Sequence, residues 1–326
     1  VMMNANRATA LPWNIYGDQR DSLALLDHGW IQAYAENNQE ALDLALMAYA
    51  VAEDPAVLTP FMVNLDGFAL THTYETVDVP AEEDADAFLP PYQATNCFDF
   101  EHPKNIGYSA GPDYNRYFKY YEHRDMLGAF EAIDRVEAHF AECFGRAYTG
   151  PVEAVSCVDA EAILVTLGSI AGLARESVAR LREQGKRVGL LRIRYMRPFP
   201  AKLIAEALAG AAAVGVLEKD ISFGAEGTLF TNVNSAHQQA GCMVPTFNFT
   251  GGLGGDDIAS AQMDAMFDAL LDSVGERGRD DAAAGRSCDD ASTGQGAGLG
   301  RVSFLGIDFS VASQPACGDD CEEGAR

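Results

Sequence analysis

The sequence predicts an α/β protein built from two units and a linker, and three observations favour this class. Apolar, β-rich runs such as residues 162–167 alternate with stretches of helical spacing, the pattern of a parallel sheet covered by helices. A chain of 326 residues exceeds the usual length of one domain. Residues 76–102 form an acidic, proline-bearing break. We expect a first unit at 1–80, a linker at 81–151, a second unit at 152–275 and a largely disordered tail at 276–326.

The charge of the chain argues against several classes of partner. Lysine and arginine number 23 against 48 aspartates and glutamates, a formal net charge of -25. Binding to nucleic acid or to an anionic membrane needs a basic surface, so neither is expected. The sequence has no run of 18 apolar residues and no secretory pattern at its start. It therefore predicts a soluble, cytoplasmic protein.

The first residues predict a site at the end of a strand. Val1 to Met3 should be the last part of a buried strand that carries Asn6 and Arg7 to the carboxyl edge of its sheet, where open α/β sheets place ligands. The chain opens in mid-strand without an initiator methionine, and the family resemblance described below implies an N-terminal truncation. The planar guanidinium of Arg7 matches a carboxylate. The alternative is a surface ion pair with Asp18 or Asp21.

Local signals predict the elements that follow. Residues 16–18 should turn, Asp21 and Ser22 should cap a helix that begins at Leu23, and residues 31–35 form a short apolar segment. Asn37, with Glu40 three positions on, has capping-box spacing before a helix at 41–53. The apolar face expected for that helix comprises Leu42, Ala45, Leu46 and Tyr49.

A second strand should lead to polar residues at the same edge. Residues 57–63 are β-rich, and Pro60 implies an edge position or a late start. Asn64 to Phe68, with Asp66 and Gly67, would follow at the carboxyl end. His72 is a candidate base, but a structural hydrogen-bonding role is favoured because no nucleophile with a paired acid stands at recognisable spacing.

The linker combines aromatic residues with a long helix. Residues 108–121 interleave tyrosines with basic side chains, which suits either nucleobase stacking or packing between subunits or domains, and the acidic surroundings favour packing. Residues 122–148 carry apolar side chains at helical spacing and predict one amphipathic helix.

The second unit predicts a parallel sheet. A strand at 162–167, the turn Gly168-Ser169, a helix at 170–184 and a strand at 188–194 make a βαβ unit. The helix start after Ser169 suits a phosphate or a carboxylate, but a simple connection is the favoured interpretation. Further elements are expected in this order: a helix from Ala201, a strand at 213–218, a helix from Thr228, a strand at 243–249, a glycine loop at 250–255 and a helix at 258–274. The turn at residues 168–169 lacks a full GxGxxG dinucleotide motif, and the glycine loop at 250–255 lacks the GK[ST] of a P-loop.

Seven cysteines are spread without a CxxC pair: Cys97, Cys143, Cys157, Cys242, Cys288, Cys317 and Cys321. This spacing indicates reduced thiols, and a metal at Cys317 and Cys321 is a minor alternative because no third ligand is near. Residues 276–300 are nearly free of apolar side chains, and residues 302–311 regain a strand-like pattern.

Several blocks in a fixed order resemble the alpha subunit of pyruvate:ferredoxin oxidoreductase and its 2-oxoacid relatives. The blocks are Asn6-Arg7-Ala8, residues 17–22, 29–32, 38–41, 64–68, 71–73, 166–169, 193–200 and 221–227. The resemblance covers the chain to about Leu271. It implies part of a pyrimidine-type, thiamine-diphosphate-binding domain followed by a transketolase C-terminal-like parallel α/β domain.

The resemblance also implies a function. Such a complex decarboxylates pyruvate oxidatively to acetyl-CoA and reduces ferredoxin, with thiamine diphosphate and magnesium shared with a partner subunit and iron-sulfur clusters in partner chains. Beta-, gamma- and delta-type subunits, coenzyme A and the 2-oxoacid are the implied partners. Arg7 matches the substrate carboxylate contact, while Asn6, Asp18, Asp66, Gly67 and His72 would lie near the cofactor or an interface. No catalytic residue is assigned, and the isolated chain is expected to be inactive. A branched-chain or oxalate enzyme, and a non-catalytic scaffold, remain alternatives.

Overall fold

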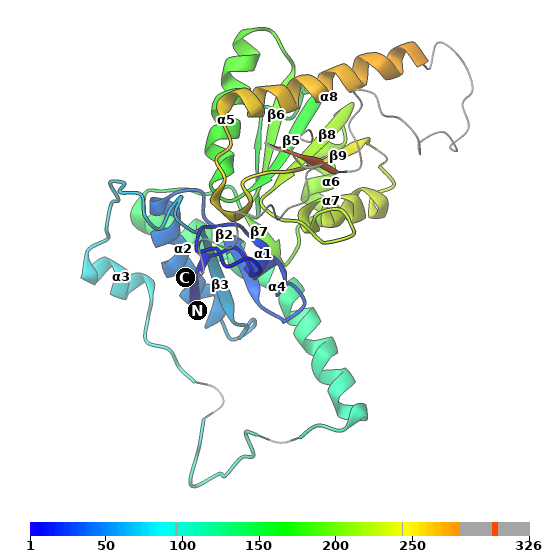
Figure 1. The fold of residues 1–326 in the computed structure, drawn as a ribbon. Helices are drawn as coiled ribbons and strands as arrows, with labels where there is room; N and C mark the ends of the chain where they lie inside the picture. The colour runs from blue at the N-terminus through cyan, green and yellow to red at the C-terminus, as the bar shows by residue number, and fades with distance from the viewer. Residues whose placement is uncertain (95–96, 108, 243, 281–301, 306–326) are drawn as a thin grey trace, which may run out of the picture.

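The computed structural model of the chain contains two open sheets (Figure 1). It describes residues 1–94, 97–107, 109–242, 244–280 and 302–305. The first sheet has the order β1-β3-β2-β7, and the second has the order β10-β9-β8-β5-β6-β4. The predicted α/β class is confirmed.

The first sheet joins three parallel strands to one antiparallel strand. The parallel strands are β1 (Met2–Asn6), β3 (Phe61–Asp66) and β2 (Ile31–Tyr34), and the antiparallel one is β7 (Tyr195–Arg197). Pro60 gives β3 the late start that the sequence predicted, because proline has no N–H for the ladder. The strand β7 was not predicted. It comes from far along the chain and ties the second half of the protein to the first sheet.

The prediction of a buried first strand is wrong. The strand β1 lies at the edge of the described sheet, and Met2 and Met3 are 36% and 46% exposed. Its register is still the expected one, because Asn6 pairs with Asp66 at the carboxyl ends of β1 and β3.

The helices of the first half differ from their predictions in detail. Helix α1 (Arg20–Leu23) is a single turn that includes Asp21 and Ser22, so these residues do not cap a longer helix. Helix α2 (Asn38–Ala52) is capped as predicted, since the Asn37 side chain accepts from the Glu40 N–H at 2.9 Å. The predicted apolar face of α2 is wrong. The buried apolar residues are Ala41, Leu44, Met47, Ala48 and Val51, whereas Tyr49 is exposed.

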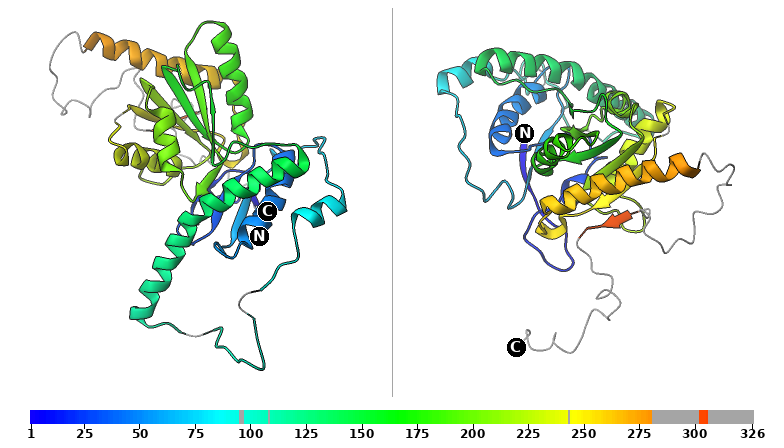
Figure 2. Two further views of the ribbon diagram at one scale, coloured as in Figure 1. Left: turned by 180° about the vertical axis from the view of Figure 1, so that it is seen from behind. Right: turned by 90° about the horizontal axis from the view of Figure 1, so that it is seen from above.

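Two further helices belong to the linker. Helix α3 (Glu82–Phe88) is short, and α4 (Pro112–Phe144) is 33 residues long. The start of α4 lies ten residues before the predicted one, because Gly111-Pro112 supplies a proline at the first helical position. Its second half packs on α2, while its first half projects from the body (Figures 1 and 2).

The second sheet follows its prediction except at β4, a strand that was not predicted. Its strands are β4 (Val152–Val155), β5 (Ala162–Leu167), β6 (Val188–Ile193), β8 (Ala213–Glu218), β9 (Thr246–Thr250) and β10 (Val302–Phe304). All neighbours pair in parallel except β4, which runs antiparallel to β6. Predicted strand β9 begins at Thr246 instead of Met243, and Met243 itself lies outside the described residues.

Helices cover both faces of the second sheet. Helices α5 (Ile170–Glu183) and α8 (Ser260–Asp280) bury one face, and α6 (Ala201–Leu208) with α7 (Thr228–Gln239) bury the other. A short 3-10 turn, η1 (Leu253–Gly255), sits in the predicted glycine loop. Helix α8 runs to Asp280, so the expected disorder is wrong at residues 276–280, and the prediction for 281–300 lies outside the described residues. The free cysteines of the described part are Cys97, Cys143, Cys157 and Cys242; the Cys317–Cys321 alternative lies outside it.

Candidate functional site

The carboxyl ends of strands from both sheets meet at one place. In the first sheet, β1 and β3 end at Asn6 and Asp66, and in the second sheet β8 leads to Lys219. The loop before α1 bridges them, since the Gln19 N–H donates to the Lys219 carbonyl at 2.9 Å and the Gln19 side-chain amide donates to Asp66 at 3.1 Å. This junction is the edge where open α/β sheets bind ligands.

Arg7 stands at this junction with its side chain exposed. Its backbone N–H donates to Asp21 Oδ2 at 2.9 Å, and its guanidinium carbon lies 5.6 Å from the centre of the Phe68 ring. Among the described residues, no carboxylate lies within 4 Å of the guanidinium nitrogens. The alternative ion pair is therefore not formed in this structure: Asp18 pairs with Arg20 at 2.6 Å, and Asp21 accepts from backbone and amide N–H groups.

Phe68 and two further rings form a platform beneath Arg7. Phe68 stacks on His72 with centroids 4.1 Å apart and an interplanar angle of 3°, and Tyr16 tilts against Phe68 at 4.6 Å. The His72 Nδ1 atom hydrogen-bonds the Thr71 hydroxyl at 2.9 Å. A cation over an aromatic face is favourable, so the platform holds Arg7 without neutralising it. His72 thus has contacts that suit a structural role.

The backbone of Phe68 is itself unusual. Its φ is +62°, a left-handed conformation that residues other than glycine seldom adopt. The preceding Gly67 allows this turn to press against the end of β1, because a Cβ at Gly67 would lie 2.0 Å from the Asn6 carbonyl oxygen. Gly67 is therefore a packing residue, because its lack of a side chain lets the Phe68 turn lie close to the end of β1.

Asn6 is fully buried and fixes the end of β1. Its amide donates to Asp21 Oδ1 at 2.8 Å and to Ser22 Oγ at 2.7 Å. Its Oδ1 atom has no hydrogen-bond partner among the described residues. Buried polar atoms are nearly always satisfied, so this acceptor is an exception at the end of β1.

Asp18 and Asp66 each join the two sheets. Asp18 is fully buried, accepts from Arg20 and also accepts from the Gly254 N–H at 3.1 Å, which anchors the glycine loop. Asp66 accepts from the Ser169 N–H at 2.9 Å and lies 3.8 Å from the Lys219 ammonium. This agrees with the favoured interpretation of the α5 start as a simple connection, because the carboxylate at this helix end is that of Asp66, from the same chain.

A cavity of about 360 Å³ opens beside the platform, between the two sheets. Its apolar wall includes Phe68, Ile170 and Ile258, and its polar wall includes Lys219 and Asp256. Its volume falls in the range of small-molecule sites. The cavity and Arg7 share the Phe68 ring, so they form one continuous surface at the carboxyl edge.

The implied cofactor can be tested against these side chains. A diphosphate needs several free donors or a metal. Each candidate donor at this edge already faces a carboxylate of the chain. Lys219 lies near Asp66, Arg20 pairs with Asp18, and Asp66 accepts from the N-terminus of α5. The described residues contain no group of three or more metal-ligating side chains. This edge fits a carboxylate at Arg7, and does not fit the diphosphate and magnesium end of thiamine diphosphate.

Sequence reasoning missed Lys219 as part of this junction, and it did not foresee the contacts that Asp21, Phe68 and Ser169 make there. Asp21 and Phe68 stand within the quoted sequence blocks, and Ser169 and Lys219 follow the carboxyl ends of β5 and β8. The rule that parallel strands deliver ligands at these ends could have identified the last two. The contact between the two sheets, which brings all four together, depends on tertiary structure.

Two family models match the chain. Residues 1–138 match the thiamine-diphosphate-binding domain of pyruvate flavodoxin/ferredoxin oxidoreductase, and residues 160–263 match core domain II of pyruvate:ferredoxin oxidoreductase. No helix of the described residues is long and apolar enough to span a membrane.

Curated relatives and a solved structure agree with these models. Pyruvate synthase subunit PorA of Methanothermobacter thermautotrophicus is 45% identical over 82% of this chain and 68% of its own length. Ketoisovalerate oxidoreductase subunit VorA of Pyrococcus abyssi is 40% identical over 82% of this chain and 67% of its own. The chain thus spans about two thirds of the length of these relatives. A 2-oxoglutarate:ferredoxin oxidoreductase from Magnetococcus marinus shares the fold, with a TM-score of 0.53 and 15% identity over 82% of this chain and 48% of that one.

Proposed function

Because this chain belongs to the pyruvate flavodoxin/ferredoxin oxidoreductase family, we propose that it is the alpha-type subunit of a thiamine-diphosphate-dependent enzyme that oxidises pyruvate to acetyl-CoA and reduces ferredoxin. The pyruvate synthase relatives support pyruvate as the substrate. The proposal extends to the beta-, gamma- and delta-type subunits, coenzyme A, a cytoplasmic location and anaerobic metabolism. We also propose that the chain divides into a first unit at 1–80, a linker at 81–151, a second unit at 152–275 and a tail at 276–326.

The observation that carries the proposal is the free guanidinium of Arg7. It is exposed at the carboxyl edge, faces no carboxylate of the described residues and lies on the Phe68 ring. A 2-oxoacid presents a carboxylate that a planar guanidinium binds through two parallel hydrogen bonds. Arg7 would hold the acid group, and the aromatic platform would keep water from one side of that ion pair.

Other chains would complete the site. Thiamine diphosphate supplies a carbanion-stabilising thiazolium when bound. Because this edge does not fit the diphosphate and magnesium end, we propose that the partner subunit holds most of the cofactor and that the iron-sulfur clusters lie in partner chains. The role of this chain is then to bind and orient the acid group. Five further residues would hold the surroundings of Arg7 in place and would not touch the substrate. Their contacts with the end of β1, the loops and the platform support this role: Asn6, Asp18, Asp66, Gly67 and His72.

A branched-chain 2-oxoacid is the second candidate substrate. The ketoisovalerate oxidoreductase relatives support it at 39–40% identity. Arg7 would serve both substrates equally, since it recognises the carboxylate that they share. An oxalate enzyme and a non-catalytic scaffold with this fold are weaker alternatives, since none of the relatives described above carries such a name.

The test is substrate profiling of the assembled complex, with Arg7→Ala and Arg7→Lys beside wild type. We expect Arg7→Ala to raise the KM for pyruvate about 10- to 100-fold, the loss of one charge-assisted contact. Arg7→Lys should recover part of the loss, because it restores charge without the fork. Lys202→Ala removes a well-exposed cation elsewhere and should match wild type. An unchanged KM in Arg7→Ala, with complex assembly intact, would favour the scaffold.

A further inference from the structure

A strand from the end of the chain forms the edge of the second sheet next to the candidate site. Strand β10, red in Figure 1, pairs in parallel with β9, and Phe304 lies opposite Thr250, the last residue of β9. The Leu305 N–H then donates to the Thr250 carbonyl at 2.9 Å. These residues lie outside both matched domains, so the family models assign them no role.

The Leu305 side chain packs against the start of the glycine loop. A Cβ at Gly251 would lie 2.6 Å from Leu305 Cδ1 and 3.3 Å from Ile258 Cδ1, so both side chains border this part of the loop. Leu305 also packs against the buried apolar cluster that includes Phe249 and Ile258. Ile258 in turn lines the cavity of about 360 Å³ beside the aromatic platform. Leu305 therefore supports the glycine loop and one wall of that cavity from behind.

The far end of the glycine loop holds the segment that precedes α1. The Gly254 N–H donates to Asp18 Oδ2 at 3.1 Å, and the Gly254 carbonyl accepts from the Asn14 side-chain amide at 3.1 Å. Gly255 lies directly against Tyr16, because a Cβ there would be 2.4 Å from the Tyr16 Cβ. The glycine loop therefore bridges β10 and the segment before α1.

This segment reaches Arg7 in two ways. The Ala8 N–H donates to the Tyr16 carbonyl at 2.9 Å, which ties the segment to the residue after Arg7. The Tyr16 ring tilts against the Phe68 ring, over which the Arg7 guanidinium lies. A continuous series of contacts therefore runs from β10, through the glycine loop and Tyr16, to the candidate carboxylate contact.

Neighbouring side chains decide where the glycine loop lies. Four of the five residues at 251–255 are glycines, which have wide backbone freedom and no side chain of their own to pack. Leu305 borders the start of the loop, Lys219 lies against its middle, and Tyr16 lies against its end. Of these three neighbours, only Leu305 stands outside the candidate site. A change at Leu305 therefore moves the loop without altering the site itself.

We propose that Leu305 is a positioning residue for the candidate carboxylate site. It holds the glycine loop against Asp18 and Tyr16, and thereby keeps the platform under Arg7 in place for the acid group of a 2-oxoacid. Leu305 does not line the cavity beside the platform, so it acts on affinity and not on the chemical step. The inference rests on the proposed function for its substrate, whereas the linkage from Leu305 to Tyr16 rests on the contacts alone.

Steady-state kinetics of the assembled complex test the effect on the substrate. Leu305→Ala should raise the KM for pyruvate about 3- to 10-fold with kcat little changed, since the site is kept but is less well held. Leu305→Met should stay within about 2-fold of wild type, because methionine refills the space.

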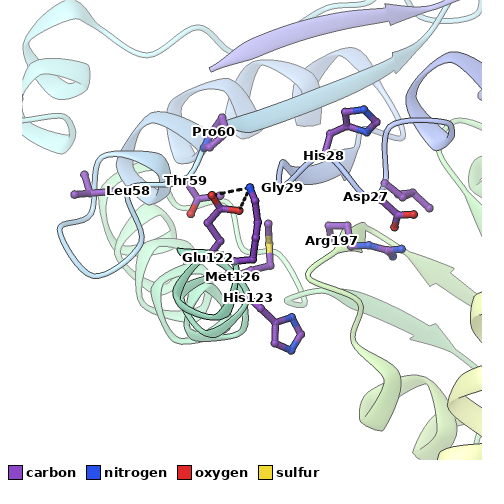
Figure 3. A pocket seen from close by; sticks show the side chains of 12 residues that line it. Asp27, His28, Gly29, Leu58, Thr59, Pro60, Glu122, His123, Met126 and Arg197 are labelled. Carbon is purple, nitrogen blue, oxygen red and sulfur yellow. Dashed lines mark hydrogen bonds and ion pairs between the residues drawn. The ribbon is translucent and has the colours of Figure 1, made fainter. Parts of the chain in front are cut away.

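Leu58→Ala is the matched control for these kinetics. Leu58 lines a hollow of about 720 Å³ at the amino ends of β2 and β3, the opposite edge of the first sheet from Arg7 (Figure 3). The substitution removes the same atoms as Leu305→Ala, but far from the glycine loop. It should therefore leave the KM for pyruvate unchanged.

A size exchange between the two contacting residues gives a sharper result. Gly251→Ala places a methyl group close to Leu305 Cδ1, so this variant alone should displace Leu305 or the loop and raise the KM for pyruvate. In the Leu305→Ala background the same methyl group enters vacated space, so the double variant should have a lower KM than either single variant. Effects that simply add would show that the two residues do not act through one contact, and would contradict the proposal.

Hydrogen exchange of the purified complex tests the linkage without enzyme activity. Leu305→Ala should speed amide exchange at residues 250–255 and 14–18 by about 10-fold or more, and Leu305→Met and Leu58→Ala should not. A wild-type complex that turns over no 2-oxoacid would contradict the proposed function and leave this linkage measurable. Unchanged exchange at residues 14–18 in Leu305→Ala, or an unchanged KM in a complex that turns over pyruvate, would overturn the inference.

Discussion

The carboxylate of Asp66 in the first sheet caps helix α5 of the second sheet through Ser169. Its Oδ2 atom accepts from the Ser169 N–H at 2.9 Å and from the Ser169 hydroxyl, 103 residues along the chain. A negative charge at a helix N-terminus interacts favourably with the helix dipole and with unsatisfied N–H groups. The two sheets are therefore joined at the edge that carries Arg7.

Replacing Asp66 by asparagine should weaken this joint. The amide keeps the size of the side chain but loses the charge that faces Ser169 and Lys219, so the free energy of unfolding should fall by about 2 kcal/mol. Ser169→Ala should cost about 1 kcal/mol. Urea denaturation of both single variants and the double variant gives their coupling. Asp256→Asn, at an exposed carboxylate in the same cavity, should change stability by less than about 0.5 kcal/mol, and an equal effect there would argue against the joint.

Asp21 should act on substrate binding through Arg7. Its two oxygens accept from the Arg7 N–H at 2.9 Å and from the Asn6 amide at 2.8 Å, so it sets where β1 ends. Asp21→Asn replaces one acceptor by a donor, and we expect the KM for the 2-oxoacid to rise about 3- to 10-fold with kcat little changed. In an Arg7→Ala background the same change should have almost no further effect on KM. Additive effects would mean that Asp21 does not act through Arg7.

Local patterns predicted more of the second sheet than of the first, although they missed its strand β4. The strand at 162–167 was predicted to the residue, because a β-rich run is bounded by a glycine turn and a helical repeat. The strand β7 has three residues and pairs with β2, far away in sequence, so local signals did not predict it. The core face of α2 was predicted wrongly because apolar residues lie around most of this helix, and tertiary packing decides which of them the core covers.

At the site, too, local patterns predicted some features, and others depend on tertiary packing. Asn6, Arg7 and Asp66 were placed at the carboxyl edge from the ends of the predicted strands, and the structure puts them there. The platform under Arg7 was not foreseen, since it depends on the left-handed backbone of Phe68 and on stacking with His72. Contacts between the sheets, such as Asp66 with Ser169, join residues about a hundred positions apart and leave no local pattern.

Glu218 should make stability fall as the pH rises. Burial, with a smaller effect of Asp220, raises the pKa of its carboxyl to about 8, although the Leu229 N–H and the Asn248 amide donate to it. The unfolded chain loses this proton near the ordinary value of 4.5, so the folded state holds more protons between pH 4.5 and 8. The free energy of unfolding should therefore decline across that window, by about 5 kcal/mol at most. Denaturant titrations from pH 5 to 9 should show the slope, and Glu218→Gln should flatten it; an unchanged slope would contradict the assignment.

Glu40 should produce the opposite dependence at acid pH. It lies at the centre of a buried ion-pair network that joins α2 to β6: Arg194 Nε donates to it at 2.8 Å, and Arg192 pairs with its other oxygen. Burial alone would raise the pKa of Glu40, but Arg192 and Arg194 hold it below its ordinary value. Its contribution to stability is present above the unfolded pKa of about 4.5 and is lost as the pH falls through the lower folded pKa.

Glu40→Gln should therefore remove that acid-side loss and lower stability at neutral pH. Two buried guanidiniums would lose a shared carboxylate, and breaking such a pair costs about 3–5 kcal/mol. Glu206→Gln is the matched control, because Glu206 is well exposed and 3.8 Å from Lys202, where an ion pair contributes at most about 1 kcal/mol. Urea denaturation at pH 7 and pH 4 measures both variants. If Glu40→Gln were as stable as Glu206→Gln at pH 7, the network would not hold α2 to β6.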